Sequence, residues 1–203
     1  MSSFGVILFD VGGVLLTNGW DHRERAAAVA QFHLDAQELE ARHVRVFEAW
    51  ERGEIDKNAY LDAAVFYKPR QFSREEFFDF MLTQSQPLPD GAMQILKEVA
   101  ASNGYMIGAL NNEARETNEF RFGKFDLRRY FQVALSSCYV GLRKPEPAMY
   151  RRALDILGKP PDRVLFIDDR EENVAGGAAA GMTAIRFTGE AALRSELERL
   201  GVV

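Results

Sequence analysis

The pattern of apolar and polar residues changes twice along the chain. Short apolar runs that end in polar residues or glycine occur near the amino terminus and again after Pro89. Between them, residues 17–88 place apolar residues at steps of three and four, which is the period of an amphipathic helix. The pattern therefore predicts a core formed by residues 1–16 and 89–203, interrupted by an all-helical insertion over residues 17–88.

Strands and helices alternate in the predicted core. The apolar run at 4–9, which leads to Asp10 and then to two glycines, has the form of a buried strand followed by a sharp turn. Alternation of strands and helices with short connections is typical of an α/β fold with a doubly wound, Rossmann-like parallel sheet. We expect strands at 4–9, 105–110, 133–136, 164–167 and 183–187, and helices at about 92–100, 113–122, 147–157, 173–180 and 193–200.

The insertion carries helix start signals of its own. Asp56 precedes a run with helical spacing, and Ser73 with Glu76 has the spacing of a capping box. An earlier stripe of apolar residues has the same period and consists of Leu39, His43, Val46, Phe47 and Trp50. A unit of this size rarely folds alone. We therefore expect a small helical subdomain that rests on the core.

Three of the predicted strands end in residues with chemically useful side chains. The first strand leads to Asp10, the second to Asn111 and Asn112, and the fourth to Asp168 and Asp169. The carboxyl ends of parallel strands share one edge of the sheet, so residues distant in sequence meet in one crevice. Carboxylates gathered there repel one another, and a cation is needed to balance their charge.

Two cations could serve this edge of the sheet. Oxygen ligands suit Mg²⁺, which is usually held by one or two carboxylates together with water and substrate phosphate. Lys144 lies in a loop with flanking prolines and supplies a second positive charge. Together these cations would bind a phosphate group, with Asp10 facing the phosphorus as a nucleophile. Each residue taken singly also has an ordinary role as a turn residue, helix cap or surface charge, so the hypothesis depends on their convergence.

Composition narrows the class of protein. The chain has 203 residues and a formal charge of −5 with acids and bases interspersed, which gives no basic surface for nucleic acid or an anionic membrane. Cys138 is the only cysteine, so no intramolecular disulfide can form and we expect a reducing, cytoplasmic location. The apolar run before Asp10 is too short for a membrane span or a signal peptide. The many aromatic residues of the insertion are compatible with a monomer or a homodimer.

Four motifs, in order and spacing, resemble those of the haloacid dehalogenase-like (HAD) hydrolase superfamily. They are residues 9–14, Asn111, Lys144 within the loop 141–147, and residues 168–173. The resemblance spans nearly the whole chain, and the helical insertion is similar to the cap of the superfamily's first class. Residues 51–55, together with residues 143–147 and 168–173, resemble the α-glucose-1-phosphate phosphatase branch in particular.

The resemblance implies a chemical role for several residues. Asp10 would attack the phosphorus of a small phosphate ester and form an aspartyl phosphate that water then hydrolyses. Mg²⁺ would be held by the Asp10 carboxylate, the Gly12 carbonyl and Asp169, with Asp168 nearby. The implied function is a magnesium-dependent phosphatase for a small phosphorylated metabolite, such as a sugar phosphate.

The same resemblance implies which residues hold the substrate. Lys144 would hold both the nucleophile and the phosphate. Asn111 and the amides of the glycine turn, Gly12 and Gly13, would contact the phosphoryl oxygens, with Asn112 beside them.

The chain departs from the superfamily pattern at three positions. Gly12 stands where most of the superfamily's phosphatases have a second aspartate, which protonates the leaving oxygen and activates water. Asn111 replaces a Ser or Thr, whose donor role an amide can fill, and Asn173 replaces an acid. Positioned acid–base catalysis is worth about 10² to 10⁴ in rate, so we expect a preference for anomeric, acyl or aryl leaving groups. The insertion could also supply an acid at the mouth of the site, where the candidates are Trp20, His22, Glu48 and Arg52.

Two other functions stay open at this point. A relative without catalytic activity would bind a phosphorylated ligand or a partner protein, which Gly12 favours and the retained Asp10 and Lys144 oppose. A 2-haloacid dehalogenase would use its aspartate to attack carbon without a metal, and Asn112 fits that chemistry. Such enzymes lack an acidic pair after the fourth strand, so residues 168–169 favour the phosphatase.

Overall fold

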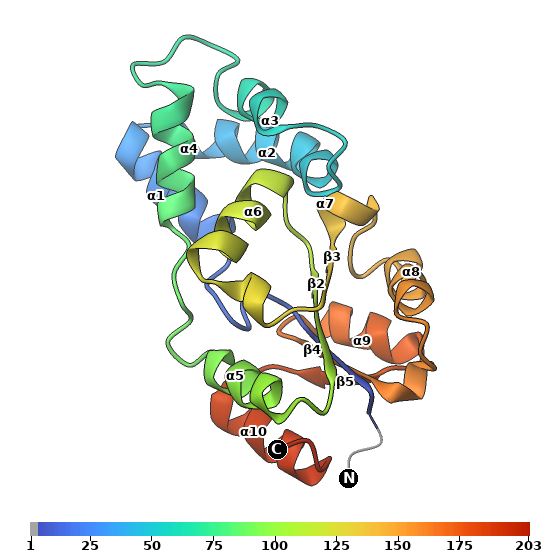
Figure 1. Cartoon of the computed structure of the whole chain (residues 1–203). Helices are drawn as coiled ribbons and strands as arrows, with labels where there is room; N and C mark the ends of the chain where they lie inside the picture. Colours follow the sequence, from blue (N-terminus) through green and yellow to red (C-terminus); the bar gives the residue numbers. More distant parts are fainter. Residues whose placement is uncertain (1–3) are drawn as a thin grey trace.

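The computed structural model describes residues 4–203 and contains a five-stranded sheet whose strands all run parallel (Figure 1). The strands are β1 (Val6–Phe9), β2 (Met106–Asn111), β3 (Val133–Ser136), β4 (Val164–Asp168) and β5 (Thr183–Arg186). They follow the order β3-β2-β1-β4-β5, so the first strand is central and the chain is wound outward in both directions. This arrangement confirms the predicted doubly wound α/β class.

The register of the central strands brings their ends to one level. Phe9, the last residue of β1, lies opposite Ala109 of β2 and Ile167 of β4. The residues that follow these strands therefore emerge together at the carboxyl edge of the sheet. The next residue, Asp10, continues the contact, because its backbone N–H donates to the Ile167 carbonyl oxygen at 2.8 Å.

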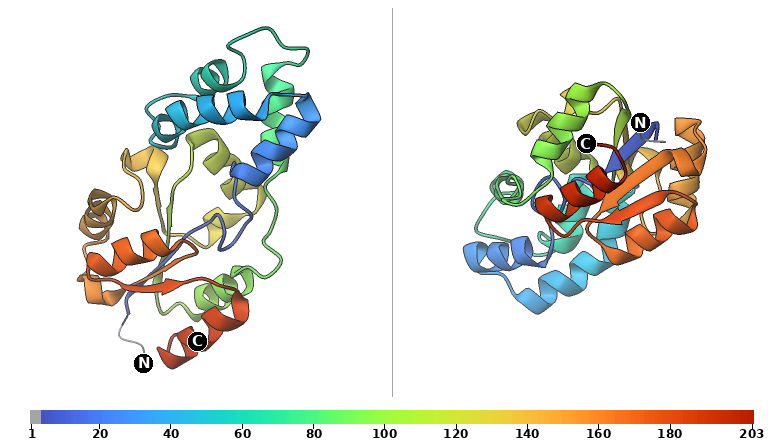
Figure 2. Two further views of the ribbon diagram at one scale, coloured as in Figure 1. Left: turned by 180° about the vertical axis from the view of Figure 1, so that it is seen from behind. Right: turned by 90° about the horizontal axis from the view of Figure 1, so that it is seen from below.

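Helices cover both faces of the sheet (Figure 2). They are α5 (Met93–Ser102), α6 (Arg115–Lys124), α8 (Pro147–Leu157), α9 (Glu171–Ala179) and α10 (Glu190–Arg199). Apolar residues of α5 and α10 pack against one face, together with Phe122 of α6. Helix α8 packs its apolar stripe against the other face, where α9 contacts both α8 and β4. Within residues 4–203, no helix combines the length and apolar character that a bilayer crossing requires.

Every predicted strand and helix of the core is present, with modest shifts at the ends. The shifts are expected, because an apolar period does not mark the exact residue at which a helix begins or ends. The sequence patterns did not predict three short segments, each too short to show a period: η1 (Leu127–Arg129), α7 (Ser137–Val140) and η2 (Pro161–Arg163).

The insertion between β1 and α5 folds as helices beyond the carboxyl edge of the sheet (Figure 1). They are α1 (His22–Phe32), α2 (Ala36–Glu51), α3 (Lys57–Ala64) and α4 (Arg74–Thr83). Asp56 caps α3, and Ser73 with Glu76 forms the predicted capping box of α4. Helix α1 was not predicted individually, because it is rich in alanine and charged residues and carries few large apolar side chains.

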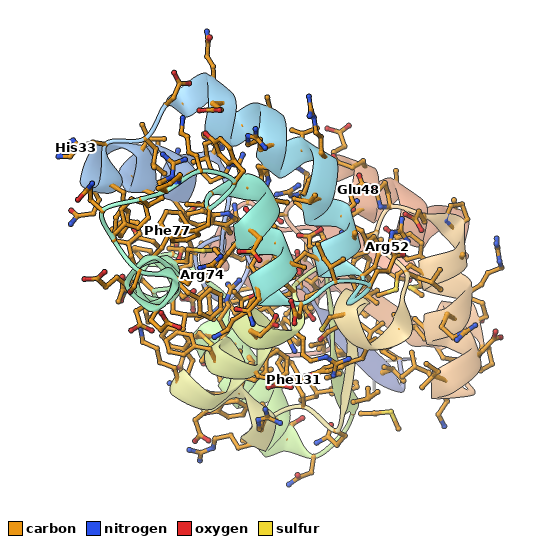
Figure 3. All side chains as sticks on the ribbon, turned by 90° about the horizontal axis from the view of Figure 1, so that it is seen from above. His33, Glu48, Arg52, Arg74, Phe77 and Phe131 are labelled. Atoms are coloured by element: carbon orange, nitrogen blue, oxygen red, sulfur yellow. The ribbon has the colours of Figure 1, made fainter. Side chains whose placement is uncertain are left out.

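The insertion has a hydrophobic cluster of its own. Phe77 of α4 is fully buried, and its ring lies near the rings of Trp20, Phe32 and Phe72 (Figure 3). Apart from Ala114, every buried residue of this cluster belongs to the insertion. The aromatic side chains of the insertion therefore pack mainly against one another, which accounts for much of the aromatic content of these helices. We propose that residues 17–88 form a cap subdomain on a core of 1–16 and 89–203, of which residues 1–3 lie outside the described part.

The substitution Phe77→Ala should lower the free energy of unfolding by about 3 to 5 kcal/mol, because it leaves a cavity at the centre of the cap cluster. Urea denaturation of the full chain measures this change. Ile156→Ala is the control, since this α8 side chain is exposed and its truncation should change stability by less than about 0.5 kcal/mol. Equal effects of the two substitutions would contradict the importance of the cap cluster.

Candidate active site

Three carboxylates and one ammonium group meet at the carboxyl edge of the sheet. Asp10, Asp168 and Asp169 each offer an oxygen atom, and these atoms lie within 4.8 Å of one another. Lys144 reaches the same place from the loop before α8. Its Nζ atom lies 3.1 Å from Asp10 Oδ1 and 2.5 Å from Asp168 Oδ2. The structure thus brings together the acidic and basic residues that the sequence pattern singled out.

Asp168 is completely buried, and its hydrogen bonds are satisfied by the protein. Besides Lys144, its carboxylate accepts from Asn173 Nδ2 at 3.0 and 3.2 Å and from the Arg170 backbone N–H at 2.9 Å. The arrangement fixes the ammonium group of Lys144 beside Asp10. Asn173 is suited to this place because it donates, whereas an acid there would face the Asp168 carboxylate and repel it.

Asp169 differs from Asp168 because it has an oxygen atom without a partner. Its Oδ1 atom is buried and accepts no hydrogen bond from any described residue. The carboxylate approaches the glycine turn so closely that a Cβ atom on Gly13 would lie 2.3 Å from Asp169 Oδ2. Gly13 also has a φ of +77°, which side chains other than glycine rarely adopt. The turn therefore needs glycine for its own backbone and for the approach of Asp169.

The electrostatics of the site call for more positive charge than Lys144 provides. Burial raises the pKa of Asp10 to about 8, although Lys144 opposes the shift. Burial also raises the pKa of Asp169, and the neighbouring Asp168 adds to the effect. Burial alone would lower the pKa of Lys144, but the charges of Asp10 and Asp168 outweigh it and raise that pKa. Burial thus makes Asp10 and Asp169 hard to ionise, and one Asp169 oxygen atom has no partner. Oxygen ligands of this kind fit a hard divalent cation.

The two asparagines after β2 take different positions. Asn112 holds the backbone of Lys144 from both sides, since its Nδ2 donates to the Lys144 carbonyl at 2.8 Å and its Oδ1 accepts from the Lys144 N–H at 2.9 Å. Asn111 instead lies in a buried network, where it donates to Asn118 and accepts from Ser136. This network uses one of the two N–H groups of the Asn111 amide, so only the other is left for the phosphate contact that the resemblance implies.

A cavity of about 400 Å³ lies between Asp10 and the cap. Asp10, Gly12 and Lys144 form part of its core wall, while α2 supplies the apolar part of its cap wall, including Phe47 and Trp50. Trp50 stacks on Tyr60, with ring centroids 4.2 Å apart. The spacing of these residues had indicated only helix packing, because periodicity shows which face is apolar and not which part of it borders a cavity.

The four cap residues predicted at the mouth of the site lie in different places. Trp20 lines the cavity and donates from Nε1 to the Tyr60 hydroxyl at 2.6 Å. His22 is exposed and lies against Asp21. Glu48 of α2 forms an ion pair with Arg143, and Arg52, which follows α2, forms one with Glu146; Figure 3 labels both cap residues. These ion pairs connect the cap to the loop that carries Lys144.

Sequence reasoning missed several charged residues in the cavity wall, two of which form a buried ion pair in the core. Glu113 and Arg121 are buried, form an ion pair and line the cavity. They lie in the predicted polar helix at 113–122, where alternating charges indicate a solvated face. Their burial depends on the cap, which covers this helix, so no local signal could have identified them.

The chain is similar in sequence to known hydrolases. A family model described as haloacid dehalogenase-like hydrolase matches residues 4–181. Flavin mononucleotide hydrolase 1 of Arabidopsis thaliana is 32% identical over 166 residues, which cover 82% of this chain and 66% of that protein. The phosphoglycolate phosphatase of Aquifex aeolicus is 24% identical over 197 residues, covering 95% of this chain and 89% of that protein.

Solved structures agree on the fold. A HAD family enzyme from Bacteroides thetaiotaomicron, solved as a magnesium complex, has a TM-score of 0.78 at 19% identity and matches 92% of this chain and 94% of its own. Because the family model matches most of the chain and the structure has the corresponding fold, this protein belongs to the haloacid dehalogenase-like hydrolase family.

Proposed function

We propose that the protein is a magnesium-dependent phosphatase that hydrolyses a small phosphate ester through an aspartyl phosphate on Asp10. The observation that carries this proposal is the position of Asp10. Its carboxylate is buried at the base of a cavity, 3.1 Å from Lys144 and next to an acidic residue with an unpartnered oxygen atom. Both relatives compared above bear names of hydrolases or phosphatases, and those names support a phosphate ester as substrate.

Each charged residue has a separate task in this proposal. The Asp10 carboxylate attacks phosphorus, and Lys144 stabilises the negative charge of the phosphoryl group. Asp168 holds Lys144 in place. Asp169, Asp10 and the Gly12 carbonyl would hold Mg²⁺, which when bound balances the carboxylates and favours the ionised form of the nucleophile.

The cap wall suggests the kind of group that the phosphate is attached to. Trp20, Phe47 and Trp50 of the cap line the cavity that Asp10 and Lys144 also line. His43 also lines it, and burial lowers the pKa of this imidazole to about 4, so the ring is neutral near neutral pH. We propose that the substrate places its phosphate in the core and a partly apolar or planar group against the cap. Membership of the α-glucose-1-phosphate phosphatase branch stays a prediction.

The haloacid dehalogenase alternative is less well supported. An aspartate that attacks carbon without a metal has no need of a second buried acid beside it. Here Asp169 is half-buried, and its buried Oδ1 atom has no partner, at the cost that burial of a polar atom carries. A cation at this place explains that arrangement, and the phosphatase is the function that uses one.

The substitution Asp10→Asn should abolish phosphatase activity, with a loss of at least about 10³-fold in kcat, because an amide cannot form the aspartyl phosphate. The measurement is phosphate release from 4-nitrophenyl phosphate and a panel of metabolite esters with Mg²⁺. Glu171→Gln is the control, since this acid is exposed on α9 and paired with Arg186. Activity that survives in Asp10→Asn would remove Asp10 from the mechanism.

Mg²⁺ should raise the melting temperature of the wild-type chain, because it binds the folded acidic cluster; at a hundred times its Kd the gain is about 2.7 kcal/mol. Asp169→Asn should lose this shift, since it removes a charged ligand. Without metal the variant should be at least as stable as wild type, because repulsion with Asp168 is relieved. Differential scanning fluorimetry with and without Mg²⁺ tests both points, and an undiminished shift in the variant would rule out Asp169 as a ligand.

The leaving group should control the rate, since Gly12 has no side chain to donate a proton. We expect 4-nitrophenyl phosphate and anomeric sugar phosphates to turn over at least about 10²-fold faster than primary alkyl phosphates, within the range that a positioned acid supplies. Steady-state kcat values over such a panel measure the preference. Equal kcat values for alkyl and aryl esters would show that another group does supply the proton.

A further inference from the structure

The cavity wall contains a buried ion pair that the proposed function does not use. Arg121 of α6 is 1% exposed, and its Nη1 atom donates to the carboxylate of Glu113, which is 8% exposed. Its Nη2 atom donates to the Thr17 carbonyl oxygen at 2.6 Å. Both charged residues line the same cavity as Asp10. Two buried charges are therefore held in the wall that the substrate would face.

Stability alone is a weak reason to keep this pair. The desolvation of two buried charges offsets much of their attraction, and well-packed apolar residues in the same place are often as stable. The pair is also held rigidly. Glu113 accepts from Thr117 Oγ1 at 2.8 Å, and its backbone N–H donates to Ser137 Oγ at 2.9 Å. Such support from surrounding side chains is what a group needs if it acts at a defined position.

The guanidinium group still has an unused donor. Within residues 4–203, two buried side-chain N or O atoms lack a hydrogen-bond partner: Asp169 Oδ1 and Arg121 Nε. The first is an acceptor at the proposed cation site. The second is a donor on a side chain that lines the cavity. A buried donor without a partner carries a free-energy cost that an anionic ligand would remove.

Two glycines allow the backbone to approach the guanidinium group closely. A Cβ atom on Gly12 would lie 3.8 Å from Arg121 Nη1, and one on Gly19 would lie 2.7 Å from the same atom. Both glycines line the cavity. A Cβ atom on Gly12 would also lie 3.0 Å from Asn18 Oδ1. The guanidinium thus borders the turn that follows Asp10, on the side where Gly12 has no side chain.

We propose that Arg121, held by Glu113 and the Thr17 carbonyl, contacts the ester oxygen of the substrate and stabilises the negative charge that forms on it. This inference rests on the proposed phosphatase function. As an Asp10 oxygen bonds to phosphorus, the bond from phosphorus to the ester oxygen breaks and its electron pair stays on that oxygen, which takes a proton from water. A second water then hydrolyses the aspartyl phosphate, which releases phosphate and restores the carboxylate. Guanidinium keeps its proton in proteins, so it acts by charge and not as an acid.

The test compares Arg121→Gln with wild type on esters of different leaving groups. A primary alkyl phosphate develops more charge on its oxygen than 4-nitrophenyl phosphate does, so its kcat should fall by about 10²-fold, as when one charge-stabilising donor is removed. The kcat for 4-nitrophenyl phosphate should fall by less than about 5-fold under the same reasoning. A purely structural Arg121 would lower both rates by the same factor, and that result would overturn the proposal.

Two further variants keep the test decisive. Arg115→Gln is the matched control, because this arginine lies on the same helix but bonds to the Cys138 carbonyl and does not line the cavity; it should leave the ratio of the two rates unchanged. If Arg121→Gln does not fold, Glu113→Gln provides the test of the role of Arg121. This substitution keeps an oxygen to accept from Arg121 and removes the adjacent negative charge. The kcat for the alkyl ester should therefore rise relative to the kcat for 4-nitrophenyl phosphate. An unchanged or opposite shift in that variant would overturn the proposal.

Failure of this inference can be separated from failure of the proposed function. If wild-type protein releases no phosphate from any ester with Mg²⁺, the phosphatase itself is wrong. If wild type is active and Asp10→Asn is not, but the Arg121 and Glu113 variants leave the rate ratio unchanged, the function stands and the role of Arg121 is wrong. Thermal unfolding of each variant confirms that the rates come from folded protein.

Discussion

Lys144 lies between two buried carboxylates, and the arrangement of the site depends on this contact. Its ammonium group bonds to Asp168, which Asn173 and the Arg170 backbone also hold, so the ammonium is fixed beside Asp10. A single positive charge does not balance the acids gathered there, as the raised pKa values of Asp10 and Asp169 show. The imbalance makes the site receptive to a divalent cation and poorly suited to a neutral ligand.

The cap adds a second wall above this charged edge of the sheet. Its helices cover the carboxyl ends of the strands, and α2 reaches the loop of Lys144 through ion pairs of Glu48 and Arg52 (Figure 3). Covering the charges reduces their contact with solvent, which strengthens the electrostatic interactions between them. The same cover buries Arg121 and Glu113. The cap therefore contributes both the apolar wall of the cavity and the low-dielectric surroundings in which the charges act.

The absence of a side chain at Gly12 affects both the charged site and the cavity wall beside it. In a chain with an acid at this position, a proton donor would stand between the nucleophile and the wall. Here the position is empty of side chain, and Asn18 and Arg121 occupy the neighbouring space. The chemistry available to the cavity changes accordingly from proton transfer toward stabilisation of charge. The change matches an aromatic cap wall, since planar leaving groups spread charge and need a proton least.

The amino-acid sequence by itself determined the α/β class, the strands and core helices, three of the four cap helices, and the convergence of Asp10, Lys144 and the acidic pair. These features depend on local periodicity and on the rule that parallel strands end at one edge. Only the tertiary structure decided that Asn111 turns into a buried network, that Asn112 holds Lys144, and that Arg121 lines the cavity. The direction of a side chain, and whether a charge is buried, depend on which distant segments pack against it, and that information is absent from any local pattern.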